Sequence, residues 1–374
     1  MDWRESFMRI FGPGVLGGLT FGQWMRLLWQ ERFAVSFSQV PRALCITALT
    51  LMNSLGRGLE ALRYGEQLRD VSVEPPIFVL GHWRSGTTHL HQLLARDRRL
   101  AFPSGYQCAF PHTFLTTERV QARLLSSLLP EHRPMDNVEW TLFSPQEDEW
   151  AICALCLESP CLGWVFPRSR RKYMRYLTFS AASPDERARW REAFTWFVKK
   201  LTWKYRRRLV LKSPPHTCRI RLLLEMFPDA KFVHIHRHPY AVFQSTRNLL
   251  LKMFAWLGLQ RPVLEEVDDW ILEQYREMYD VFFEERKFIP PGSYHELAFE
   301  DLDRNPMGEV RKVYEALGLP DFAGTEGDLQ RYVDSLRGYQ KNKFPQLPEP
   351  LAERIQTMWQ ASFAEWGYEA VGAI

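Results

Sequence analysis

The hydrophobic pattern of the chain changes at residues 74–76, where two prolines end a helical stretch and precede an apolar run. Before this point, residues 1–72 show helical periodicity interrupted by glycines. After it, short apolar runs alternate with amphipathic stretches, which is the pattern of strands that alternate with helices. We therefore predict an α/β protein: a helical N-terminal region over 1–72, then a P-loop-like parallel sheet flanked by helices over 73–374.

A long insertion interrupts this alternation between residues 100 and 208. The segment is mainly helical in pattern and rich in aromatic and basic residues. Charge runs of this kind usually form solvated helix faces, and the alternative is a surface for an anionic acceptor or for lipid headgroups. We expect the insertion to form part of an acceptor site.

The uncharged run of residues 43–56 lies between Arg42 and Arg57. As a helix it would span about 21 Å, which is shorter than the ~30 Å hydrocarbon core of a membrane. Two interpretations stay open: a helical hairpin packed on the catalytic domain, or a segment that lies along a membrane surface. The N-terminus lacks the pattern of a signal peptide, so we expect a cytoplasmic protein, peripheral at the membrane in the second interpretation.

Composition and charge limit the partners. A net charge of +4 is small for 374 residues, so we expect no general binding to nucleic acid. The six cysteines show no paired framework, which indicates a reducing compartment. Cys153, Cys156 and Cys161 cluster without a nearby histidine, so we predict buried thiols there and no metal site.

An apolar strand at residues 78–80 runs into a loop bounded by Gly81 and Gly86, and a helix begins near Thr87. Backbone amides at such a loop and helix start commonly hold a phosphate. The P-loop of nucleoside triphosphatases has a lysine directly after its second glycine. Here Thr87 occupies that position, and the cation is Arg84 within the loop. The sequence therefore predicts an anionic ligand other than ATP with magnesium.

A second apolar strand, residues 231–236, ends at Arg237, and the helix that follows carries Ser245 eight residues later. An arginine at a strand end and a serine in the next helix can bind one phosphate dianion from two sides. Both loops are expected at the carboxyl ends of parallel strands, where ligands of such sheets bind. Together they suit a nucleotide phosphorylated at both ends.

At these two segments the chain resembles the sulfotransferases that use 3'-phosphoadenosine 5'-phosphosulfate (PAPS), in particular a bacterial branch related to the carbohydrate and tyrosine sulfotransferases. Further segments match the family pattern in order and spacing: 209–216, 227–231 and 294–319. The resemblance covers roughly residues 75–320. It implies that the first loop binds the 5'-phosphosulfate, that Arg237 and Ser245 bind the 3'-phosphate, and that the nucleotide product is PAP.

The resemblance also implies which residues hold the nucleotide and stabilise the transferring group. The nucleotide-binding set is Arg84, Ser85, Gly86, Thr87, Thr88, His89, Arg237 and Ser245. Lys212, at the end of the strand in 209–216, approaches the sulfuryl group together with Arg84. Sulfuryl transfer depends on positioning and charge stabilisation, and fixed cations can supply the charge without a metal.

The acceptor hydroxyl needs a base, and the acids of residues 147–149 are the leading candidates. They precede an apolar segment, where burying a carboxylate is costly, although acids at a helix start also serve as caps. The bacterial branch is similar here, including the preceding stretch 133–137. We favour Glu147 as the base, with Glu149 second. His216 is the third candidate, because Pro214 occupies the position of the histidine that small-molecule sulfotransferases use.

The predicted activity is the transfer of a sulfuryl group from PAPS to a hydroxyl of a carbohydrate or lipid-like acceptor by in-line displacement. One alternative is a P-loop kinase or another nucleotide-dependent transferase, and the missing lysine after Gly86 argues against it. The other alternative is a catalytically silent, membrane-associated scaffold, and the intact anion-binding residues argue against that.

Overall fold

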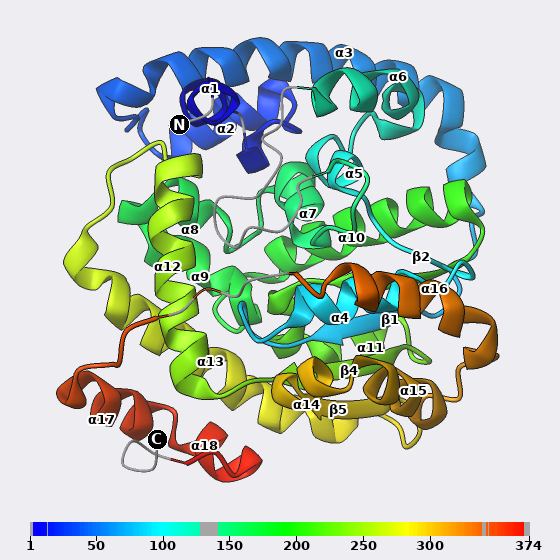
Figure 1. Ribbon diagram of the computed structural model, residues 1–374. Coiled ribbons are helices and arrows are strands. Elements are labelled where there is room, and N and C mark those ends of the chain that lie inside the picture. The colour runs from blue at the N-terminus through cyan, green and yellow to red at the C-terminus, as the bar shows by residue number, and fades with distance from the viewer. Residues whose placement is uncertain (1–2, 13, 128–140, 339–341, 343, 370–374) are drawn as a thin grey trace. The chain divides into compact units, whose positions relative to one another are not determined.

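The computed structural model describes residues 3–12, 14–127, 141–338, 342 and 344–369 (Figure 1). The chain divides into two compact units. The first unit comprises Met1–Glu74, Ala101–Leu209 and Leu251–Val263, and the second comprises Pro75–Leu100, Val210–Leu250 and Leu264–Ile374. The N-terminal helices and most of the helical insertion are therefore parts of one unit, and most of the sheet lies in the other.

The sheet has the strand order β2-β3-β1-β4-β5. The strands are β1 (Ile77–Leu80), β2 (Leu100–Ala101), β3 (Arg208–Lys212), β4 (Lys231–His236) and β5 (Tyr294–Ala298). β1 pairs in parallel with both β3 and β4, and β4 pairs in parallel with β5. Val79 of β1 is in register with Lys212 and with Val233. The carboxyl ends of the three central strands therefore meet at one edge, and the predicted α/β fold is confirmed.

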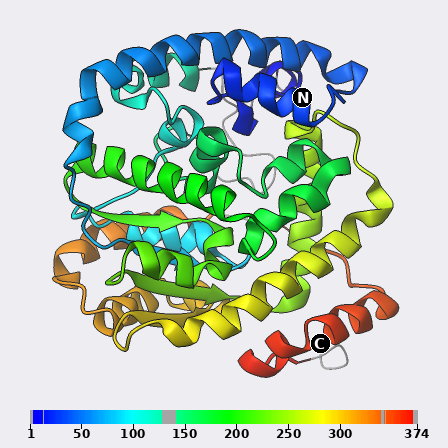
Figure 2. The same cartoon turned by 180° about the vertical axis from the view of Figure 1, so that it is seen from behind.

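Alternate residues of the central strands point to opposite faces of the sheet, and both faces are buried. On one face, Val79, Val233 and Ile235 belong to an apolar core that includes residues of α4 (Thr87–Leu94) and α15 (Pro306–Ala316). On the other face, Phe78 stacks on Phe232 with ring centroids 5.6 Å apart. Figures 1 and 2 show α4 and α15 on one side of the strands and α13 (Val267–Glu285) on the other.

The remaining helices of the second unit complete these two layers. They are α11 (Ile220–Met226), α12 (Pro239–Leu257, which continues into the first unit), α14 (Phe299–Arg304), α16 (Phe322–Ser335), α17 (Glu349–Met358) and α18 (Gln360–Trp366). Trp359, between α17 and α18, stacks on Tyr275 of α13 at 3.7 Å between ring centroids. Trp366 stacks on His236 of β4 at 4.6 Å, so the C-terminal helices are tied to the sheet by aromatic contacts.

The first unit is helical, as predicted for the N-terminal region and the insertion. Its helices are α1 (Trp3–Phe11), α2 (Phe21–Gln30), α3 (Val40–Arg69), α5 (Gly105–Ala109), α6 (Phe114–Ser126), α7 (Asp148–Cys156), α8 (Leu162–Val165), α9 (Arg170–Thr178) and α10 (Pro184–Tyr205). The uncharged run 43–56 lies within α3, which continues to Arg69. Among the described residues, no helix combines the length and the hydrophobicity needed to cross a membrane.

A histidine–carboxylate pair joins β4 to β5. His234 and Glu296 are neighbours in the register, and His234 Nδ1 lies 2.7 Å from Glu296 Oε2. Tyr294 donates a second hydrogen bond of 2.9 Å to the same oxygen. Burial alone would raise the pKa of Glu296, but the bonds from His234 and Tyr294 outweigh it and lower that pKa to about 2.

We predict that Glu296→Gln makes the protein less sensitive to acid. A lowered carboxyl pKa adds stability that is fully present above pH ~4.5 and is lost as the pH falls toward ~2. Thermal unfolding should show the variant roughly 1–3 kcal/mol less stable at pH 6, with the difference closing below pH 3. The exposed Glu353→Gln serves as the control. A difference that stays constant with pH would contradict this interpretation.

Candidate active site

Two glycines shape the loop that follows β1. Gly81 has φ +143° and Gly86 has φ +105°, values that favour glycine. A Cβ atom on Gly81 would lie 2.5 Å from the carbonyl oxygen of Ile235, and one on Gly86 would lie 2.4 Å from Cδ2 of Phe299. The loop therefore needs glycine at both positions to pass close to β4 and α14.

The protein holds this loop in place with its own hydrogen bonds. The Gly81 amide donates to Thr217 Oγ1 at 2.8 Å, and Ser85 donates to the His82 carbonyl from its amide at 3.1 Å and from its hydroxyl at 2.8 Å. The amide and hydroxyl of Ser85 thus have partners within the loop. Gly86 is the N-cap of α4, so the amides of the first helical turn, including Thr87 and Thr88, lack acceptors within the helix.

His82 is a neutral, structural member of the loop. Its side chain is fully buried, and burial lowers its pKa to about 4, although the hydrogen bond to the Trp83 carbonyl opposes that shift. Nδ1 donates this bond over 2.8 Å. The ring therefore adds no positive charge to the loop near neutral pH, and the cation there is Arg84.

The structure brings the two predicted anion-binding segments into direct contact. Arg84 Nε donates a hydrogen bond of 2.8 Å to Ser245 Oγ in α12. Arg237, just after β4, donates from Nη1 to the Arg84 carbonyl at 3.3 Å. β1 and β4 are paired in parallel, so the two segments leave neighbouring strands at the same edge. Arg84, Arg237 and Ser245 therefore form one cluster, defined here as the arginine–serine cluster.

Arg237 is held in a partly buried setting. Its guanidinium lies over the ring of Phe299 at 4.4 Å from the centroid. Burial lowers the pKa of Arg237, and the nearby carboxylate of Glu300 opposes that shift. Glu300 itself accepts hydrogen bonds from the His238 amide at 3.1 Å and from the Tyr368 hydroxyl at 3.0 Å. A desolvated cation favours an anionic ligand at this cluster.

Lys212 lies at the end of β3, the strand on the other side of β1. Its side chain is buried, and Nζ lies 3.4 Å from Thr88 Oγ1 in the first turn of α4. His89 follows in the same turn. The structure thus brings Lys212 and Thr88 together beside the loop, with the arginine–serine cluster on the neighbouring strand.

The three candidate bases have different surroundings. His216 is fully buried in a 3-10 turn, Pro214–Cys218, where its ring meets Phe78 edge-on at 5.3 Å between centroids. Glu147 occupies the N-cap position of α7 without capping it through its side chain, and Glu149 is fully buried in the first turn. The two glutamates belong to the first unit and Lys212 to the second. The stretch 133–137 lies outside the described residues.

Sequence reasoning missed three residues that support the site. Thr217 holds the Gly81 amide, Phe299 lies under Arg237 and against Gly86, and Glu300 binds the amide after Arg237. Phe299 and Glu300 lie in the predicted late strand-to-helix unit, but nothing in its pattern indicated contacts with residues as far away as Arg237, His238 and Gly86. Their roles depend on strand pairing that no local motif encodes.

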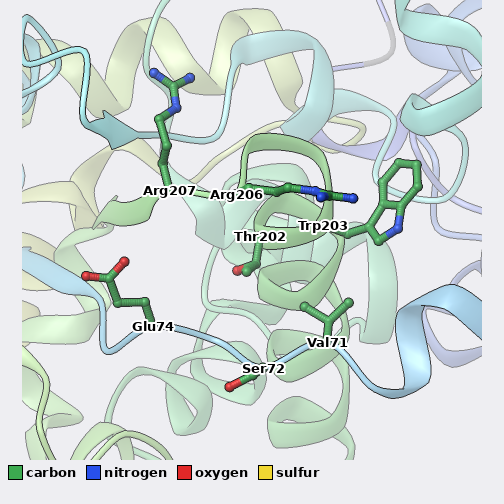
Figure 3. A pocket seen from close by; sticks show the side chains of 7 residues that line it. All are labelled: Val71, Ser72, Glu74, Thr202, Trp203, Arg206 and Arg207. Atoms are coloured by element: carbon green, nitrogen blue, oxygen red, sulfur yellow. The ribbon is translucent and has the colours of Figure 1, made fainter.

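A pocket in the first unit contains none of the predicted site residues. It lies between the end of α10 and the segment that follows α3 (Figure 3). The residues that line it are Val71, Ser72, Glu74, Thr202, Trp203, Arg206 and Arg207. We assign no function to this pocket.

Comparisons with known proteins identify the family of this chain. The model of the sulfotransferase family matches residues 75–323, and the chain belongs to this family. The omega-hydroxy-beta-dihydromenaquinone-9 sulfotransferases Stf3 of Mycobacterium tuberculosis and of Mycobacterium bovis are each 37% identical to it, over 98% of this chain and 93% of theirs. The chain is therefore a sulfotransferase, which confirms the predicted enzyme class and decides against a kinase.

Solved structures support the fold. The sulfotransferase STF9 from Mycobacterium avium matches with a TM-score of 0.68 and 22% identity, over 88% of this chain and 87% of that one. STF1 from Mycobacterium tuberculosis matches with a TM-score of 0.65 and 19% identity, over 91% and 92% of the two chains. At these identities the likeness concerns the fold alone.

We predict that Gly86→Ala destabilises the protein, because the added Cβ meets Phe299 and the residue must keep a positive φ. The cost should be about 1–3 kcal/mol, measured by chemical unfolding. Gly65→Ala in α3 is the matched control, since a Cβ there meets nothing within 4 Å and should leave stability unchanged or raise it. Equal stability of the two variants would contradict the close approach of the loop to α14.

Proposed function

We propose that this sulfotransferase moves a sulfuryl group from PAPS to the hydroxyl of a lipid-like alcohol, with a carbohydrate acceptor as the second candidate. The observation that carries the donor assignment is the arginine–serine cluster. There, the loop after β1 and the residues after β4 share a hydrogen bond between Arg84 and Ser245. One ligand with two separated phosphate groups can contact both segments at once.

The donor-binding residues match the two ends of such a nucleotide. The amides at the start of α4, with Thr88 and Lys212, suit the 5'-phosphosulfate. Arg237 and Ser245 suit the 3'-phosphate, and Arg84 bonds to Ser245 at the same cluster. We therefore place Arg84 between the two ends and assign the main charge stabilisation at the transferring group to Lys212. Ser85 supports the loop conformation through its bonds to the His82 carbonyl, and His89 stays a candidate contact for the nucleotide.

In the proposed reaction the acceptor oxygen forms a bond to the sulfur as the bond between sulfur and the 5'-phosphate oxygen breaks. Negative charge develops on that phosphate oxygen, and Lys212 stabilises it. The acceptor hydroxyl gives its proton to Glu147, and PAP leaves with both of its phosphates. Glu149 and His216 are the second and third candidates for the base.

The nature of the acceptor is supported by the relatives. By their name, the Stf3 enzymes act on an omega-hydroxylated dihydromenaquinone, a lipid that ends in an alcohol. Identity of 37% over almost the whole chain supports an acceptor of the same chemical class. A carbohydrate hydroxyl offers the same nucleophile on a different carrier, and an assay with both acceptors separates them.

We predict that the enzyme transfers label from [35S]PAPS to a long-chain isoprenoid quinol with a terminal hydroxyl, and that Lys212→Ala reduces kcat at least ~100-fold. Lys252→Ala, a substitution in the part of α12 that belongs to the first unit, should retain activity. Loss of folding would be detected by circular dichroism, so a low rate with a native spectrum reports on chemistry. Full activity of Lys212→Ala would contradict the role of this cation, and transfer only to glycans would contradict the lipid acceptor.

We predict that Glu147→Gln lowers kcat by about 10²–10⁴-fold, because the amide cannot accept the acceptor proton. Glu149→Gln, two positions along the chain, is the matched comparison. Single-turnover rates with saturating PAPS and acceptor measure the chemical step directly. If Glu147→Gln keeps full activity and Glu149→Gln does not, the base is Glu149 and our first assignment is wrong.

A further inference from the structure

The outward side of α3 is apolar along most of the helix. Most of its exposed apolar residues are three, four or seven positions apart, spacings that bring residues to one face of a helix. These residues, defined here as the α3 outer face, are Val40, Leu44, Leu51, Met52, Leu55, Leu59 and Leu62. Leu55 is 74% exposed and Leu62 is 88% exposed. From Val40 to Leu62 the face extends about 33 Å along the helix axis.

The opposite side of α3 carries buried polar residues. Asn53 donates to the carbonyls of Gly17 and Leu19 at 2.6 and 3.0 Å. Arg42, 1% exposed, donates to the Gly258 carbonyl at 3.2 Å. The side of α3 that faces the unit thus carries four buried polar residues beside the apolar Ile46 and Leu68, and the side that faces away carries exposed apolar residues. A surface helix of a water-exposed protein has the reverse arrangement.

A buried ion pair holds α3 in this orientation. Glu60 of α3 is paired with Lys200 of α10, and both side chains are almost completely buried. Lys200 also donates to the Pro111 carbonyl at 2.5 Å, and burial lowers its pKa to about 8, a shift that Glu60 opposes. Rotating the helix to bury its leucines would expose this network and break its hydrogen bonds. The outer face is therefore a fixed feature of the fold.

Neighbouring elements of the same unit also carry exposed apolar residues. Phe7 and Ile10 of α1 are 40% and 49% exposed, and Trp29 and Phe37, at the end of α2 and before α3, are 77% and 93% exposed. α1, α2 and α6 lie on the same side of α3, which leaves the outer face uncovered in both views (Figures 1 and 2). Such an extent of exposed apolar surface usually marks an interaction site.

The exposed charged residues of these elements are almost all positive. Over α2, α3, the segment between them and α6, the exposed charged residues are Arg26, Arg32, Arg57, Arg63, Arg69, Arg119, Arg123 and Glu66. Seven cations against one anion complement a negatively charged surface. Apolar side chains that enter the acyl region, with arginines beside them, are the pattern of an interfacial helix.

We infer that the α3 outer face docks on an anionic lipid bilayer, with the helix parallel to the membrane plane. The inference rests on exposure and charge within the first unit, and it does not depend on the donor or the acceptor assignment. It gives the enzyme a position at the surface where a lipid-borne alcohol is present. A second copy of this chain is the competing occupant, and the experiment below separates the two.

The full chain should co-sediment with vesicles of phosphatidylcholine and phosphatidylglycerol, and less with phosphatidylcholine alone. We expect Leu55→Glu with Leu59→Glu to lower the partition coefficient more than about tenfold. Leu264→Glu is the matched control, because Leu264 is 57% exposed and lies in the second unit. This variant should bind the vesicles as the unmodified protein does. Arg57→Gln with Arg63→Gln should weaken binding to the anionic vesicles and reduce its dependence on salt.

Two results would overturn the inference. One is vesicle binding that the paired leucine substitutions leave unchanged. The other is a protein that does not bind vesicles but sediments as a dimer, with Leu55→Glu and Leu59→Glu converting it to a monomer, because the outer face would then be an interface between copies. Binding of PAP to these variants should equal that of the unmodified protein, so a failure of the donor assignment would be seen separately.

Discussion

The parallel pairing of β1 with β4 is the constraint on which the proposed donor site depends. These strands are adjacent in the sheet but about 150 residues apart in the chain. Their pairing brings the loop after β1 to the start of α12, where Arg84 bonds to Ser245 and Arg237 bonds to the Arg84 carbonyl. β3 pairs with the other side of β1 and adds Lys212. Three strand ends thus supply one set of cations, amides and hydroxyls at a single edge.

This arrangement costs stability at several points, and the surrounding fold compensates. Two glycines accept positive φ, and Arg84, which is not glycine, has φ +70°. Arg237 loses part of its hydration, and contact with Phe299 and the field of Glu300 replace some of it. The hydrogen bond that Thr217 accepts from the Gly81 amide and the one that Ser85 donates to the His82 carbonyl hold the loop before any ligand arrives. A site organised in this way needs little rearrangement to bind an anion.

Local patterns in the sequence predicted those parts of the structure that are set locally. The glycine spacing, the apolar strands and the arginine after β4 lie within short segments, so their motifs could be read directly. The contact between Arg84 and Ser245 joins residues 161 positions apart, and it follows from the sheet rather than from either motif. The orientation of α3 also depends on distant contacts. The uncharged run can be found in the sequence, but the side of the helix that faces outward is set by partners such as Lys200 and Gly258.

The nature of the bound nucleotide tests the central claim most directly. Isothermal titration of PAP and of adenosine 5'-monophosphate, which lacks the 3'-phosphate, should show a preference for PAP in the unmodified protein. If Arg237 and Ser245 bind the 3'-phosphate, Arg237→Ala should lower the affinity for PAP by about 10–100-fold. The affinity for the monophosphate should stay almost unchanged. Arg311→Ala, an exposed arginine paired with Glu326, is the control. An equal loss of affinity for both nucleotides would contradict the account, and so would unchanged affinity for both.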